Sequence, residues 1–155
     1  MIQALQITPE ILASNTDNIN FDTVDLRTNT ANCCGWLQYM PGSSDFTIIG
    51  GGLFEVSFNA NVTSPTAGPV AIALKSGTGS DYEGTEVDTE ITTPGVYENV
   101  SFTKLIRLCP RVNTTISVGS LPAIGSSGTP TTDPVETVVP TVKDAQIIIR
   151  KVCGN

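Results

Sequence analysis

The chain contains no histidine among its 155 residues. This absence excludes the Ser-His-Asp triad, the Cys-His dyad and most metal sites, because each of them needs an imidazole. The sequence also lacks GxGxxG and P-loop motifs, and no helical pattern follows the glycines at 50–52. It therefore predicts a protein that is not an enzyme and that has neither a cofactor nor a metal ion.

Charged residues are scarce, at 15% of the chain against about 25% in a typical domain. Eight basic residues face fifteen acidic ones, which gives a net charge of −7. No basic stripe is available to neutralise phosphates, and the same acidic excess disfavours an anionic membrane surface. We therefore expect no nucleic-acid partner and no membrane partner.

Long apolar runs are also missing. No run of about 18 apolar residues suggests a membrane span. The first residues, MIQALQITPEILASN, lack the basic region and the apolar core of a secretion signal. The sequence thus predicts that the chain folds in the cytoplasm of a cell, even if it ends up outside one.

The four cysteines are Cys33, Cys34, Cys109 and Cys153. They contain no CxxC pair, so their spacing is weak as a zinc signal, and adjacent Cys33 and Cys34 do not easily bond to each other. The pattern favours buried or semi-buried thiols. A disulfide formed after release and a metal site remain as alternatives, and the redox state stays open.

What the chain does contain is Thr, Ser, Asn, 14 Gly and 10 Pro. This composition is typical of strands with one solvated face joined by many turns. Apolar residues alternate at 53–62 and again at 70–76. Weaker patterns predict further strands at 21–28, 36–40, 46–49, 85–91, 96–109, 114–119 and 143–153. Short strands without a helical period predict an all-β protein, a two-sheet antiparallel jelly-roll sandwich.

The alternating positions predict which side chains form the core. The inward-facing residues are expected to be Phe54, Val56, Phe58, Ile72, Leu74, Val100, Phe102, Ile147 and Ile149. The last strand is apolar on both faces, because Ile148 and Val152 oppose Ile147 and Ile149. A two-layer sandwich does not easily cover both faces of one strand, so we expect Ile148 and Val152 to lie in an interface between subunits, with a loop lid as the alternative.

Residues 1–20 lack the periodicity of a segment that folds alone. Residues 2–7 suggest a short strand, and Pro9 suggests the first position of a helical turn. We therefore expect an N-terminal docking arm at 1–20 and a jelly-roll domain at 21–155. The apolar residues of the arm, which need a partner surface, are Ile2, Leu5, Ile7, Ile11 and Leu12.

Two other segments are unusual. Residues 81–98 contain six acidic residues and no Lys or Arg, which favours a solvated edge strand over a Ca²⁺-binding loop. Residues 121–142 form a Pro/Thr-rich loop that is too long to be a mere connection. Its order is not predicted.

The strand patterns resemble those of the tumour-necrosis-factor and complement-globular-head family of jelly rolls. The matching segments are Gly52–Phe58, Val70–Leu74, Val96–Cys109, Thr114–Val118 and Ala145–Lys151. The pattern is most similar to the small bacterial and bacteriophage members of this family. The chain lacks the collagen-like stalk that other members of the family have. The resemblance implies a compact homotrimer, in which the sheet with the first and last strands faces the threefold axis.

This resemblance leads to an expected role. We expect a structural protein of the virion, a trimeric capsid decoration or head-fibre protein of a tailed phage that is assembled in the host cytoplasm. It would contact a capsid or other virion protein through its N-terminal arm. The alternatives are a tail-fibre tip that binds a receptor or a host-surface glycan, and a component of a bacterial surface or spore coat.

Overall fold

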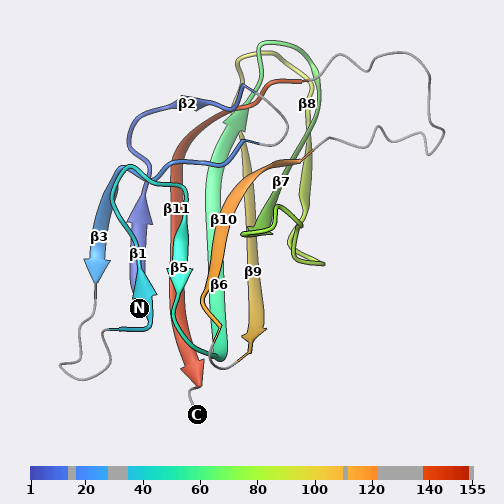
Figure 1. The fold of residues 1–155 in the computed structure, drawn as a ribbon. Coiled ribbons are helices and arrows are strands. Elements are labelled where there is room, and N and C mark those ends of the chain that lie inside the picture. Colours follow the sequence, from blue (N-terminus) through green and yellow to red (C-terminus); the bar gives the residue numbers. More distant parts are fainter. Residues whose placement is uncertain (14–16, 28–34, 110–111, 122–137, 154–155) are drawn as a thin grey trace.

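The computed structural model describes residues 1–13, 17–27, 35–109, 112–121 and 138–153, except the side chains at 26, 27 and 153. In this part of the chain all regular secondary structure is β-strand (Figure 1). The strands are β1 (Ile2–Leu5), β2 (Glu10–Ile11), β3 (Thr23–Arg27), β4 (Leu37–Gln38), β5 (Phe46–Ile48), β6 (Gly52–Thr63), β7 (Gly68–Ser76), β8 (Val87–Ile91), β9 (Glu98–Leu108), β10 (Thr114–Leu121) and β11 (Thr141–Cys153).

The strands form two antiparallel sheets. The first sheet has the order β3-β1-β11-β6-β9, with β2 paired to the beginning of β11. The second sheet has the order β4-β5-β10-β7-β8. Strands distant in the sequence are therefore neighbours, as in β1 beside β11 and β10 beside β7 (Figure 1). This arrangement confirms the predicted two-sheet jelly roll.

The alternation in β6 explains why the two sheets pack together. Phe54, Val56 and Phe58 are buried between the sheets, whereas Glu55 and Ser57 point to the outer face. Burying each large apolar side chain contributes about 1.5–3 kcal/mol to stability. The inward residues of β11, beside β6 in the same sheet, and of β7, in the opposite sheet, belong to the same hydrophobic cluster, so the core is continuous.

The structure buries eight of the nine residues expected in the core: Phe54, Val56, Phe58, Ile72, Leu74, Val100, Ile147 and Ile149. The ninth, Phe102, is half-buried and packs against the core. Its ring stacks on Phe58 with 5.3 Å between ring centroids. Phe102 lies on β9, the edge strand of the first sheet.

Two register shifts interrupt β11. One lies between Lys143 and Gln146, where Asp144 has a φ of 53°, and the other between Lys151 and Cys153. The first shift changes which parity faces inward, because both Val142 and Ala145 are buried. After this shift Ala145, Ile147 and Ile149 share the inward parity, so Ile148 lies on the outer face.

The expected division at residue 20 is wrong, because the beginning of the chain is part of the sandwich. Strand β1 lies between β3 and β11, and Ile2 pairs with Ile149. Ile2 and Leu12 are 1% exposed and belong to the core. They are therefore unavailable for docking. The predicted helical turn at Pro9 is also wrong, since Glu10–Ile11 forms β2 and pairs with the beginning of β11.

Candidate interaction surfaces

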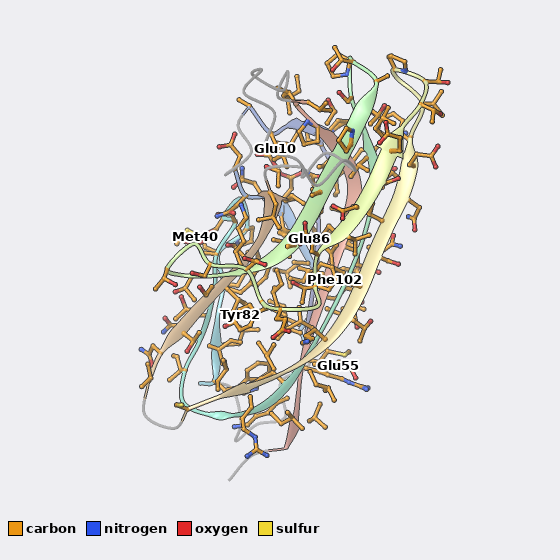
Figure 2. All side chains as sticks on the ribbon, turned by 90° about the vertical axis from the view of Figure 1, so that its right-hand side faces the viewer. Glu10, Met40, Glu55, Tyr82, Glu86 and Phe102 are labelled. Atoms are coloured by element: carbon orange, nitrogen blue, oxygen red, sulfur yellow. The ribbon has the colours of Figure 1, made fainter. Side chains whose placement is uncertain are left out.

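No described residues form a group of three or more metal-ligating side chains. In the acidic segment, Glu86, Asp88 and Glu90 are exposed along the edge strand β8 and just before it. Burial, together with the charges of Asp88 and Asp81, raises the pKa of the Glu86 carboxyl. This edge of the sandwich faces the viewer in Figure 2, where Glu86 and Phe102 are labelled.

The cysteines are only partly described. Cys109 is a free thiol and is exposed just after β9, so the expectation of a buried or semi-buried thiol is wrong at this position. Cys33 and Cys34 lie outside the described residues, and so does the side chain of Cys153. The Pro/Thr-rich loop likewise lies mostly outside them. None of the described residues forms a helix that is long and apolar enough to cross a membrane.

The outer face of the first sheet is formed by three long adjacent strands, β11, β6 and β9. Strand pairing places Ile148 of β11, Ser57 of β6 and Thr103 of β9 in one row across this face. The hydroxyl of Thr103 donates to Ser57 Oγ at 3.1 Å. Hydroxyl and amide side chains continue this pattern toward the beginning of β9, so much of the face is polar.

An amide cluster occupies the part of this face nearest the beginning of β9. Asn59 Nδ2 donates to Asn99 Oδ1 at 3.2 Å, and Asn99 Nδ2 donates to the carbonyl oxygen of Ala60 at 3.1 Å. Asn61 Nδ2 donates to Asp144 Oδ2 at 3.2 Å. The amide cluster therefore connects the bulge of β11 to β6 and β9.

Charged and apolar side chains follow at the other end of the same face. Arg150 Nε lies 2.7 Å from Glu55 Oε1, and Leu105 of β9 is opposite Glu55. Leu105 and Val152 are about half-exposed. Ile148, the other predicted interface residue, is half-buried in the single chain.

Carboxylates hold the N-terminal loop, residues 6–12, against the sandwich. Asp22 Oδ2 accepts hydrogen bonds from the backbone N–H groups of Ile7 and Thr8, at 3.0 and 2.9 Å. The bond from Thr8 is the main cause that lowers the pKa of Asp22. Glu10 Oε2 accepts hydrogen bonds from Gln6 Nε2 and the backbone N–H of Asn20.

Of the five residues expected to dock, the structure leaves two strongly exposed. Ile7 and Ile11 are exposed, Leu5 is half-buried, and Ile2 and Leu12 lie in the core. Sequence reasoning missed Met40, which is exposed in the β4–β5 turn. It also missed Asp22 and Glu10, because no local pattern connects these carboxylates to backbone groups ten or more residues away.

The two sheets and their strand order define a jelly roll of the tumour-necrosis-factor and complement C1q type. The globular domain of zebrafish complement 1qA has this fold, with a TM-score of 0.60 at 13% identity over 99% of this chain and 98% of that one. Murine APRIL is also similar, with a TM-score of 0.51 at 11% identity over 92% and 96% of the two chains. No protein-family model matches the sequence, and no curated protein matches it.

Proposed function

We propose that the chain is a homotrimeric structural protein of a tailed-phage virion, a capsid decoration or head-fibre protein without catalytic activity. The observation that carries the trimer is the outer face of the first sheet. There Leu105, Ile148 and Val152 remain wholly or partly uncovered on the long strands β9 and β11. The resemblance of the strand patterns to small phage jelly rolls supports the virion role.

The polar part of this face is compatible with such an interface. Its amides and hydroxyls already bond to one another, as in Asn59 with Asn99 and Thr103 with Ser57. Groups that are satisfied within the subunit lose less on leaving water than unpaired ones do. A second subunit would therefore cover the apolar side chains without leaving these polar groups unpaired.

Light scattering or mass photometry tests the trimer. The unaltered protein is expected to have three times the chain mass of 16.3 kDa at micromolar concentration. The variant Ile148→Ala with Val152→Ala should dissociate more readily while its chain still folds. Val96→Ala is the matched control, because Val96 is similarly exposed in the turn before β9. A stable monomer of the unaltered protein contradicts the trimer.

Mass spectrometry of purified particles from a phage that encodes the chain tests the virion role. Peptides of the chain should co-purify with full heads in a fixed ratio to the major shell protein. Peptides only in the tail fraction would favour a tail-fibre tip. Absence from both fractions contradicts a virion role and favours a component of the bacterial surface.

A further inference from the structure

Strand β9 is the only long edge strand among the described residues. It has 11 residues, pairs with β6 on one side and has no described strand on the other. The other strands at the edges of the sheets, β2, β3, β4 and β8, have at most five residues each. A short edge strand offers few free N–H and C=O groups to another chain, whereas a long one can accept a further strand. The edge of β9 therefore needs some other protection.

The sequence of β9 is suited to pairing with another strand. Every residue from Glu98 to Leu108 pairs with β6 without a register shift, so no bulge turns the edge away from a partner. Residues 99–106 contain no proline, and their polar side chains alternate with apolar ones up to Lys104. Segments with high β-propensity and little charge pair readily with copies of themselves. Lys104 is the one charged residue within this stretch.

Lys104 lies on the inner face of β9, where a charged residue is unusual. Its Cα partner is Val56, which is buried in the core, and directly opposed residues of two paired strands point to the same side of the sheet. The inward residues before and after it on β9 are Phe102 and Ile106, which are half-buried and buried. Lys104 therefore interrupts the apolar row of the edge strand, and its own side chain is half-buried.

The amine of Lys104 reaches the turn that precedes β8. A Cβ atom at Gly84 would lie 3.1 Å from Lys104 Nζ, and Gly84 has a φ of +73°. Glu83 and Glu86 flank Gly84 closely in the sequence, and both are exposed. The apolar stem of Lys104 thus starts from the inner face of the first sheet, while its charge lies beside an acidic, solvated turn of the second sheet.

We propose that Lys104 keeps the free edge of β9 from pairing with the same edge of a second copy of the chain. An added strand would extend the first sheet beyond β9 and enclose the amine between the two sheets, away from water. Burying a charge in this way is unfavourable, and an edge-to-edge pair would bury one amine from each copy. Lys104 therefore opposes pairing between copies while it leaves the pairing of β9 with β6 intact. This inference depends neither on the trimer nor on the virion role.

Light scattering over a range of protein concentrations tests this role. Lys104→Met removes the charge but keeps an unbranched stem, so the chain should still fold. At high concentration its mass should rise to about twice that of the unaltered protein or more, because edge pairing joins copies of the chain. Lys104→Arg keeps the charge and should retain the mass of the unaltered protein. Lys151→Met is the matched control, because Lys151 also pairs with a buried residue, Phe54, but lies on the central strand β11.

Hydrogen exchange shows whether β9 makes the new contact. In Lys104→Met at high concentration, the backbone amides of residues 98–108 should exchange more slowly than in Lys104→Arg, because N–H groups at the free edge become bonded. If Lys104→Met does not unfold cooperatively in urea, Lys104→Thr provides the same test with an uncharged residue that favours strands. An unchanged mass overturns the proposal, and so does a rise in mass without slower exchange in β9. An equal rise in Lys151→Met would also reject it, since the effect would then come from the lost charge at any position.

Discussion

Strands β7 and β11 are both central strands with apolar inner faces, but their outer faces differ. Ala71, Ala73 and Lys75, the outward residues of β7, are buried within the single chain. On β11, Ile148 is half-buried and Val152 is about half-exposed. The strand that is covered on both sides therefore carries two alanines and one lysine on its outer face. The strand with large outward aliphatic side chains is the one whose outer face is exposed. A partner subunit would therefore bury the most apolar surface there.

The backbone near Asp17 covers part of the outer face of the second sheet at Gly119 of β10, which pairs with Ala73. A Cβ atom at Gly119 would lie 2.2 Å from the carbonyl oxygen of Asp17. The backbone at Asp17 and Asn18 thus approaches β10 as closely as a glycine permits. The amide of Ser120 donates to the same carbonyl oxygen at 3.0 Å.

The largest effect is expected from a charge on the covered face. Ala73→Asp should destabilise the fold by about 3–5 kcal/mol, because it leaves a buried carboxylate without a partner. Ser101→Asp, on the exposed outer face of β9, should change the unfolding free energy of the dilute chain by about 0.5 kcal/mol or less. Urea denaturation measures both. Equal losses of unfolding free energy would mean that the outer faces of β7 and β9 do not differ in burial.

A smaller effect is expected at the close approach of the backbone. Gly119→Ala should cost about 2–3 kcal/mol, since β10 or the segment at Asp17 must move to admit the methyl group. Gly35→Ala is the control, because no atom lies within 4 Å of its Cβ position. Thermal unfolding of the two variants provides the comparison. A Gly119→Ala protein as stable as the control would show that the segment at Asp17 yields easily.

Much of the fold was predictable because β6, β7 and β9 alternate regularly and their core residues follow from that alternation. The register shifts of β11 were not, since Asp144 in a bulge has no local signature. The covered face of β7 was hidden as well. Alanine occurs at both buried and solvent-exposed strand positions, and a lysine at position 75 predicts a solvated strand end.

The interaction surfaces were predictable only in part, for a related reason. Ile7 and Ile11 are apolar residues in a polar context and could be singled out, as could Ile148 and Val152. Ile2 and Leu12 have the same character, and only their strand pairing and burial separate them from Ile7 and Ile11. Contacts such as Asp22 with Thr8 depend on tertiary structure, which sequence spacing does not encode.

Lys75 offers a sharper test of the covered face, with a smaller effect. Burial lowers the pKa of its amine below the usual 10.5, although the charge of Asp17 opposes this. Lys75→Met should therefore change the stability at neutral pH by about 1 kcal/mol or less, because the apolar stem is retained and a buried charge is removed. Lys75→Ala, which also loses the stem, should be less stable than Lys75→Met.

The pH dependence of the stability tests whether the buried amine of Lys75 causes this change. The unfolded state binds the Lys75 proton more tightly than the folded state, so stability should rise with pH between the lowered pKa and 10.5. Lys75→Met should flatten this rise in urea midpoints measured from about pH 7 to about pH 10. An unchanged slope would mean that Lys75 is solvated in solution.

The smallest effect is expected from the exposed ion pair on the open face. Arg150 and Glu55 are close, but their side chains are 55% and 23% exposed. Pairs of this kind contribute about 0.2–1 kcal/mol, and salt screens them. Arg150→Ala should therefore lower the unfolding free energy of the dilute chain by about 0.5 kcal/mol or less, and a double-mutant cycle with Glu55→Ala should give a coupling of similar size. If the cycle is repeated at concentrations where the trimer forms, the coupling should increase, because a neighbouring subunit would exclude water from the pair. A coupling that is small and equal in both states would place Arg150 and Glu55 outside the interface and restrict the trimer contact to other parts of the first sheet.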